Sequence, residues 1–252
     1  MDPSQLPRVG TISNPEHDFY YQYSDLAGKR LLCIGFSEPE VERYVAKHGP
    51  ASITLLTNWT DHVDAKVTHF PMVIGDITRR TDFGDDSFDA ILTLSVLEHL
   101  SPLRSAFSEM TRLVKPGGEM LHMFGPAWSC AYGHHIYAKP NDPLLNFSLW
   151  DMPAHMHLLC SQSEIERYYV AQGYSPEIAD TVMHWYYETK LINRVFYDEY
   201  VQIMSDDSFQ IDRMQLMYNE LPREHLSLLR KMHPGHHDFS TYGGRYKLIV
   251  RK

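Results

Sequence analysis

Four histidines with the capacity for proton transfer stand in one aromatic segment, residues 125–159. They are His134, His135, His155 and His157. Histidine titrates near neutral pH, so a histidine beside a substrate hydroxyl can act as a general base. We take His135 as the first candidate for such a base, with His134 and His157 behind it. A hydrogen-bonded structural or substrate-contacting histidine is the alternative at each position.

The same histidines, together with Asp151, are side-chain types that bind zinc and other divalent ions. None of the usual zinc-ligand spacings occurs among them. We therefore expect no metal, and a divalent metal site stays the rival interpretation of the cluster. If residues 155–157 are extended, His155 and His157 point the same way.

The elements that must position this segment lie before it, in residues 75–124. This stretch reads as a strand end, a polar loop, an apolar strand over 88–94, a helix over 102–114, a Lys-Pro-Gly-Gly break and a second strand over 119–124. That order is typical of a parallel α/β sheet. Such sheets bind ligands beyond the carboxyl ends of their strands, where the long 125–159 loop begins. A loop of this length is usually functional.

Three further apolar runs predict strands over Arg30–Ile34, Ser52–Thr57 and Tyr246–Val250. A helix is expected near Pro39, after the first of them. We also predict a strand over Glu177–Trp185, with a helix as the alternative there, and mostly helical structure from Glu188 to Met232. The last strand of the chain is expected to run antiparallel to its neighbour.

Composition sets broad limits on the function. The 252 residues carry a net charge of −9, which argues against a broad nucleic-acid footprint. The N-terminal stretch lacks the pattern of a signal peptide, and no apolar run is long enough to span a membrane. Three widely spaced cysteines favour a reduced compartment. We therefore expect a cytoplasmic protein without a membrane span or a nucleic-acid partner, and a homo-oligomer stays open.

Three motifs together resemble class I S-adenosylmethionine (SAM) dependent methyltransferases. They are an acidic residue after the third strand, Asp76, the run SFDAILTLSVLEHL and the turn LVKPGG. The resemblance implies a seven-stranded, mostly parallel Rossmann-like α/β sheet with helices on both faces and a helical lid insertion. It also implies a single domain over 1–252, with a cofactor-binding core at 25–125, an active-site loop at 126–160 and a lid at 186–235.

The resemblance further implies SAM as the cofactor and six residues that line its site. These are Gly35, Ser37, Asn58, Asp76, Ile77 and Ser95. Asn58 stands where the family has an acid for the ribose hydroxyls, and Asp76 and Ile77 stand where the family meets the adenine. The sequence departs from the family pattern at Cys33, which replaces an acid, and in the glycine loop, where only the first glycine is kept. We therefore expect weaker SAM binding than is usual in the family.

The segment WSCAYGHHIY, with DMPAHMHLL after it, resembles a subset of these enzymes associated with sugars and surface polysaccharides. This implies a small-molecule or saccharide acceptor, methylated at oxygen. The altered glycine loop leaves two alternatives. One is a methyltransferase fold that binds without catalysis, and the other is an enzyme of the same fold that performs different chemistry.

Overall fold

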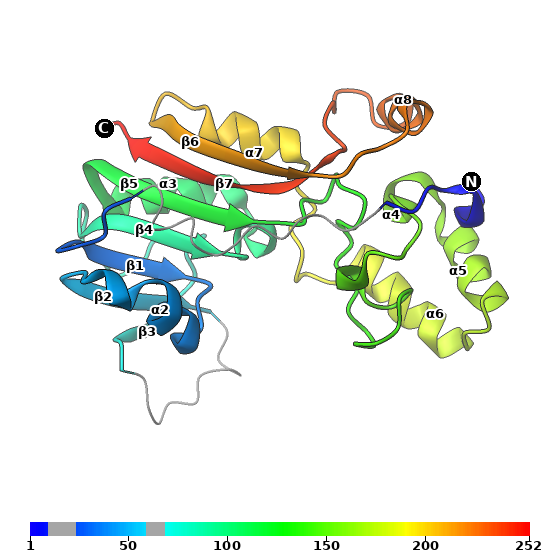
Figure 1. The fold of residues 1–252 in the computed structure, drawn as a ribbon, viewed down its shortest axis with the longest axis horizontal. Coiled ribbons are helices and arrows are strands. Elements are labelled where there is room, and N and C mark those ends of the chain that lie inside the picture. The colour runs from blue at the N-terminus through cyan, green and yellow to red at the C-terminus, as the bar shows by residue number, and fades with distance from the viewer. Residues whose placement is uncertain (10–23, 59–68) are drawn as a thin grey trace. The chain divides into compact units, whose positions relative to one another are not determined.

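The computed structural model describes residues 1–9, 24–58 and 69–252 (Figure 1). Residue contacts divide the chain into two compact units. The sheet unit comprises Pro15–Phe124, Val201–Gln215 and Gly244–Lys252, and the loop unit comprises Met1–Asn14, Gly125–Tyr200 and Leu216–Gly243. The interpretation of residues 1–252 as a single domain stays a prediction.

The sheet has seven strands in the order β3-β2-β1-β4-β5-β7-β6. β1 to β5 pair in parallel, and β7 runs antiparallel to β5 (Figure 1). The seven-stranded, mostly parallel sheet is thus confirmed. The strands are β1 Arg30–Ile34, β2 Ser52–Thr57, β3 Met72–Ile74, β4 Phe88–Leu94, β5 Val114–Phe124, β6 Phe209–Tyr218 and β7 Thr241–Val250.

The central strands β1 and β4 are almost continuously buried, as interior parallel strands are. Successive side chains on β5 point to opposite faces of the sheet. Leu121 packs in one cluster with Val41 of helix α2, whereas the ring of its neighbour His122 lies 5.1 Å from the ring of Phe107 on helix α3. Helices therefore cover both faces, as expected.

The chain also forms seven α-helices, a π-helix and several short 3-10 turns within the described residues. They are η1 Pro3–Gln5, α2 Glu38–Tyr44, η2 Ala46–His48, η3 Leu97–His99, α3 Leu103–Leu113, η4 Phe147–Leu149, α4 Met156–Leu159, α5 Gln162–Ala171, α6 Pro176–Met183, the π-helix η5 His184–Glu188, α7 Tyr197–Met204 and α8 Arg223–Met232.

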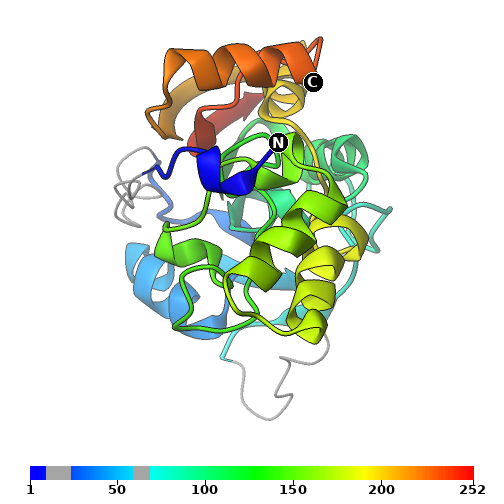
Figure 2. The ribbon, with the colours of Figure 1, turned by 90° about the vertical axis from the view of Figure 1, so that its right-hand side faces the viewer.

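The loop unit has its own hydrophobic core, rich in aromatic residues. Tyr132, Tyr169 and Tyr186 are fully buried in it, together with side chains from α4, α5 and α6. Helices α5 and α6 lie side by side there (Figure 2). Inside this core the hydroxyl of Tyr169 donates to the carbonyl of Leu144 at 2.7 Å.

The strand predicted over 177–185 is wrong, because these residues form α6 and the start of η5, which agrees with the helical alternative. The prediction that 188–232 is mostly helical is also wrong, because Phe209–Tyr218 is the edge strand β6 between α7 and α8. The expected lid region 186–235 therefore contains a strand of the main sheet.

Candidate functional site

The parallel strands of the sheet unit bring the expected cofactor residues to one edge. Gly35 follows β1, Asn58 follows β2, Asp76 follows β3 and Ser95 follows β4. Because these strands are parallel and in register, their carboxyl ends meet at the same edge of the sheet. The strand order reverses between β1 and β4, and such a switch point is where open α/β sheets bind ligands.

Gly35 sits at this switch point and has to be a glycine. Its φ is +79°, in the left-handed region. A β-carbon there would lie 2.5 Å from the carbonyl oxygen of Leu94 and 2.8 Å from the β-carbon of Val96. The backbone of the turn after β1 therefore lies so close to the end of β4 that only a glycine fits between them. The glycines of nucleotide-binding turns permit the same close approach of the backbone.

Ser37 and Asn58 take different places on this edge. Ser37 begins α2, and both its backbone N–H and its hydroxyl donate to Oε2 of Glu40 at 2.7 Å. Its side chain is therefore engaged in a helix cap. Asn58 is exposed directly after β2, and its amide can both donate to and accept from a diol.

Asp76 uses one carboxylate oxygen to close the turn after β3. Its Oδ1 accepts from the backbone N–H of Thr78 at 2.9 Å and from the Thr78 hydroxyl at 2.7 Å. Its Oδ2 lies 3.6 Å from Nε of Arg79, and the side chain is 37% exposed. Oδ2 is thus the oxygen that can accept from a ligand. Ile77 is 2% exposed and forms part of the interior.

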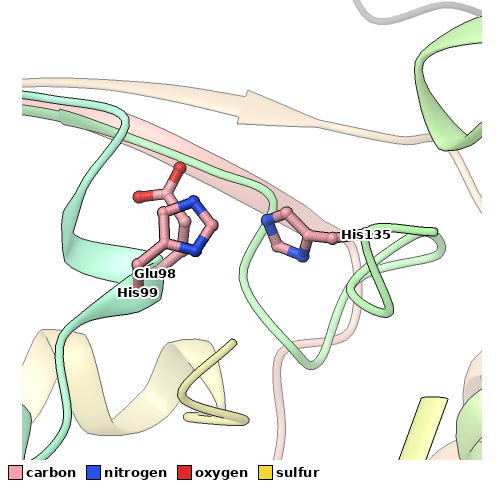
Figure 3. A group of neighbouring side chains, drawn as sticks. All are labelled: Glu98, His99 and His135. Atoms are coloured by element: carbon pink, nitrogen blue, oxygen red, sulfur yellow. The ribbon is translucent and has the colours of Figure 1, made fainter. Parts of the chain in front are cut away.

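The turn after β4 combines backbone strain with a buried acid. Ser95 is exposed and has φ +45°, rare for a residue other than glycine and common at functional sites. Its N–H donates to the carbonyl of Met123 at 2.8 Å, which fixes the turn. Glu98 and His99 follow on η3 (Figure 3), and Glu98 is 2% exposed.

Cys33 lies inside β1 and carries no charge. It is fully buried in the cluster between β1, β2, β4 and α2, and burial raises the pKa of its thiol. The position where the resembled family has an acid is therefore apolar here. Any cofactor on this edge is held without a carboxylate from β1.

His135 belongs to the loop unit, on the segment that follows β5 (Figure 3). Its φ is +52°, and its ring lies 5.2 Å from the ring of Phe147. Nδ1 is 2.7 Å from the carbonyl of Gly133. Because a carbonyl only accepts, Nδ1 carries the proton, and in the neutral ring the lone pair is on Nε2.

His134 and His157 are buried in the core of the loop unit, and their bonds fix opposite tautomers. The N–H of Ile136 donates to Nδ1 of His134 at 3.2 Å, so the neutral ring is protonated at Nε2. Nε2 of His157 lies 2.8 Å from the carbonyl of Trp128, so that nitrogen is protonated and Nδ1 holds the lone pair. The two ring centroids are 5.3 Å apart.

His155 is bonded at both nitrogens. Its Nε2 donates to the carbonyl of Phe239 at 3.0 Å, and its Nδ1 accepts from Nε2 of His225 at 3.1 Å. The expectation of an extended segment is wrong, because His155 precedes helix α4. The rings of His155 and His157 are nevertheless nearly parallel, with centroids 6.4 Å apart.

Burial keeps these histidines neutral. It lowers the pKa of His157 to about 3 and places the pKa values of His134 and His155 well below the ordinary histidine value. The neighbouring His157 lowers the pKa of His134 and His155 further. Near neutral pH the cluster therefore acts through lone pairs and N–H groups rather than through positive charge.

Sequence reasoning missed Glu98, Tyr186 and His225. Glu98 lies on η3, in the turn that follows the apolar strand β4, and an acid soon after an apolar strand was the available signal. Tyr186 stacks on His134 with centroids 4.4 Å apart, and it comes from the π-helix, a form frequent at functional sites. No sequence pattern links His225 with a histidine that precedes it by 70 residues.

The strand-end residues fit an adenosine ligand. Gly35 permits close backbone approach, exposed Asn58 offers an amide for a diol, and Oδ2 of Asp76 offers an acceptor for an amino group.

No described helix is long and apolar enough to cross a membrane.

Comparisons with known proteins find similarity to methyltransferases. Residues 27–122 match the family model described as a methyltransferase domain. The chain is 30% identical over 122 residues to sterol 24-C-methyltransferase ERG6A of Gibberella zeae, covering 44% of this chain and 32% of that protein. It is also 30% identical over 112 residues to the sterol 24-C-methyltransferase of Yarrowia lipolytica, covering 41% of this chain and 29% of that one. The chain thus spans about a third of the length of these curated relatives.

Two solved structures share the fold over nearly the whole chain. An S-adenosylmethionine dependent methyltransferase from Mesorhizobium loti has a TM-score of 0.54 at 11% identity, covering 92% of this chain and 95% of that one. Another, from Listeria monocytogenes, has a TM-score of 0.54 at 13% identity, covering 94% and 96%. Residues 27–122 therefore match a methyltransferase domain, and the chain shares the fold of these two SAM-dependent methyltransferases.

Proposed function

We propose that this protein transfers a methyl group from SAM to a hydroxyl oxygen of a small molecule. The observation that carries the proposal is Gly35 at the β1/β4 switch point, within the matched methyltransferase domain. The left-handed turn at Gly35 would let a nucleotide pack directly against the backbone. Any other residue at this position would place a β-carbon in collision with Leu94 and Val96.

The residues of the strand edge would hold the cofactor. Asn58 would bond the ribose hydroxyls, Oδ2 of Asp76 would accept from the adenine amino group, and the turn at Ser95 would lie along the methionine part. Ile77 would support the adenine from inside the sheet unit. SAM, when bound, supplies a methyl group activated by a sulfonium. Transfer forms an O–CH₃ bond, breaks the S–CH₃ bond and releases the hydroxyl proton to a base.

A loop histidine is proposed as that base, with His135 first. Nε2 of His135 carries the lone pair, because Nδ1 donates to the carbonyl of Gly133. His157 also offers a lone pair, at Nδ1, but burial lowers its pKa to about 3, which makes it a weak base. His134 offers an N–H instead, so in its present tautomer it would assist as a donor.

The acceptor is proposed as a small molecule, with a saccharide as one member of that class. Among the aromatic residues of the loop unit, exposed Tyr137 and half-buried Trp150 could offer flat faces on which a ring stacks. The names of the curated relatives specify a sterol and a carbon atom. A sterol therefore belongs in the screen beside hydroxylated compounds.

A binding protein without catalysis is the second candidate. The observation that favours it is the missing charge on the strand edge, where Cys33 is neutral and Asn58 stands after β2. Such a protein would bind SAM or its product without turning over an acceptor. An enzyme that uses the same fold for other chemistry would bind SAM and convert a substrate without methylating it.

The test begins with calorimetry using S-adenosylhomocysteine, the demethylated product. We expect saturable binding by one molecule per chain, and a folded protein that shows none overturns the proposal. Transfer of labelled methyl groups is then screened over phenols, nucleotide sugars, glycans and sterols. Label found on oxygen supports the proposal, label found on carbon corrects the acceptor atom, and binding without label favours the second candidate.

A further inference from the structure

Nε2 of His134 and Nδ1 of His157 are buried imidazole nitrogens on neighbouring rings of the loop unit. Neither has a hydrogen-bond partner among the residues that the structure describes. Both rings are fully enclosed by protein, and buried polar atoms are otherwise almost always bonded. A pair of such atoms on neighbouring rings indicates a group that the protein itself does not supply.

The two nitrogens are chemically complementary. The bond from Ile136 fixes His134 as a donor at Nε2, and the bond to Trp128 fixes His157 as an acceptor at Nδ1. The ring centroids are 5.3 Å apart and the planes are inclined by 76°. One small group that both accepts and donates can satisfy this pair.

The charge and chemistry of the pair exclude the simple ions. A carboxylate or phosphate would accept from His134 but place negative charge against the lone pair of His157. An ammonium would donate to His157 but meet the N–H of His134. A hydroxyl oxygen does both, because it has one O–H and two lone pairs.

The surroundings suit an apolar body attached to that hydroxyl. Tyr186 stacks on His134 with centroids 4.4 Å apart, and Trp128 lies edge-on to His157 at 4.5 Å. Tyr186 comes from the π-helix η5, which packs within the same core. The guanidinium of Arg194 lies 5.3 Å from the Trp128 ring and donates to the carbonyls of Thr189 and Tyr186. Besides burial, its positive charge also lowers the pKa of His157, which favours the lone pair on that ring.

We propose that His134 and His157 form a binding site for the hydroxyl of a phenol or alcohol, with His134 donating to its oxygen and His157 accepting its proton in a hydrogen bond. The inference rests on the proposed function in one respect, since it names the hydroxyl-bearing class from which the acceptor comes. The residues that would bind the hydroxyl all belong to the loop unit. A water molecule could make the same two hydrogen bonds in place of the ligand hydroxyl.

Phenol is titrated into the full-length protein labelled with ¹⁵N-histidine, and its binding is followed by NMR. Long-range proton–nitrogen correlations report the bonding of each ring nitrogen. We expect phenol to shift Nε2 of His134 and Nδ1 of His157 together in a saturable way. Toluene, which has the ring without the hydroxyl, should shift neither. Anisole, whose oxygen only accepts, should bind more weakly than phenol.

Two substitutions remove the ligand-facing atom and keep the local bond. His134→Asn retains an acceptor for the N–H of Ile136 but has no group at Nε2. His157→Gln retains a donor for the Trp128 carbonyl but has no acceptor at Nδ1. Each should weaken phenol binding by about fivefold to tenfold, the effect of one hydrogen bond. His155→Gln, which keeps the donor to Phe239, is the matched buried control and should change phenol binding less than twofold.

The outcomes separate the inference from the proposed function. If phenol shifts neither nitrogen, water alone fills the pair and the inference is overturned, whatever S-adenosylhomocysteine does. If either substitution leaves phenol affinity unchanged in a folded variant, the site is also overturned. S-adenosylhomocysteine binding should be unaffected by His134→Asn. A protein that binds phenol at this pair but never binds S-adenosylhomocysteine keeps the hydroxyl site and loses the methyltransferase proposal.

Discussion

The carbonyl oxygen of Leu94 lies 2.5 Å from the point that a β-carbon on Gly35 would occupy. Gly35→Ala should therefore push the turn after β1 away from β4 and reduce affinity for S-adenosylhomocysteine at least tenfold, measured by calorimetry. Gly49→Ala is the control, because Gly49 also has a left-handed φ, +66°, but open space around its β-carbon position. Both variants incur backbone strain, so a similar loss of affinity in both would show that Gly35 has no special part in binding.

Asp76 divides its two oxygens between the turn and the proposed ligand. Asp76→Ala removes both functions and should weaken S-adenosylhomocysteine binding by roughly 1–3 kcal/mol, the value of a hydrogen bond left unmade. Thr78→Val removes only the hydroxyl that donates to Oδ1, so it serves as the control for loss of the turn. Equal losses in the two variants would assign the effect to the turn alone.

His122 is a buried histidine in the sheet whose titration should reduce stability in acid. Burial lowers its pKa to about 3, and its Nδ1 lies 2.9 Å from the hydroxyl of Thr93. Because the unfolded pKa is higher, about 6.5, the unfolded chain binds the extra proton first as pH falls. The free energy of unfolding should then drop by up to about 1.4 kcal/mol per pH unit below pH 6.5, and stay level above it.

Urea unfolding at pH 7.5 and pH 5 measures this drop. His122→Asn keeps an acceptor or donor for Thr93 and cannot titrate, so its loss of stability between the two pH values should be smaller by about 2 kcal/mol. His237→Asn, at an exposed position, controls for the loss of a histidine. An unchanged pH profile in His122→Asn would assign the acid sensitivity to other groups, His157 among them.

Arg112 bonds two acids in different surroundings, which allows a matched comparison. Although burial opposes it, hydrogen bonds from Arg112 and Thr81 lower the pKa of Glu109 to about 2. Glu109→Gln should destabilise the protein by about 3–5 kcal/mol, because it leaves a largely buried guanidinium short of its partner. Asp85→Asn changes the acid that is 65% exposed, on the same arginine, and should cost at most about 1 kcal/mol. Urea unfolding at pH 7 compares them, and equal losses would contradict the buried-pair explanation.

The first half of the chain could be predicted from sequence because its local signals agree. Arg30–Ile34 and Ser52–Thr57 are strands as expected, since each is a short apolar run that ends in a turn. The helix expected over 102–114 is α3, Leu103–Leu113. Parallel strands then place their following residues at one edge, so the grouping of the expected cofactor residues follows from topology.

The predictions for the second half of the chain failed where the local sequence pattern and the tertiary structure differ. A strand was predicted over Glu177–Trp185, but the buried positions Ala179, Val182, Met183 and Tyr186 recur at helical spacing. Ser175 and Pro176 were the helix-start signal that the interpretation passed over.

Strand β6 gave no alternating signal, because nearly all of its side chains are exposed. Its conformation depends on pairing with β7 rather than on its own residues. The histidine tautomers were equally unreadable, because they depend on backbone groups of Ile136 and Trp128 that only the fold brings near.

The placement of β7 between β5 and β6 has a consequence for synthesis on the ribosome. β6 emerges first, at 209–218, but the strand that connects it to the rest of the sheet, 241–250, is translated later. Until then β5 is an open edge and β6 has no inner neighbour, while its apolar Met214, Leu216 and Tyr218 remain exposed. A chain that still lacks a paired β7 therefore presents two incomplete strand edges at once.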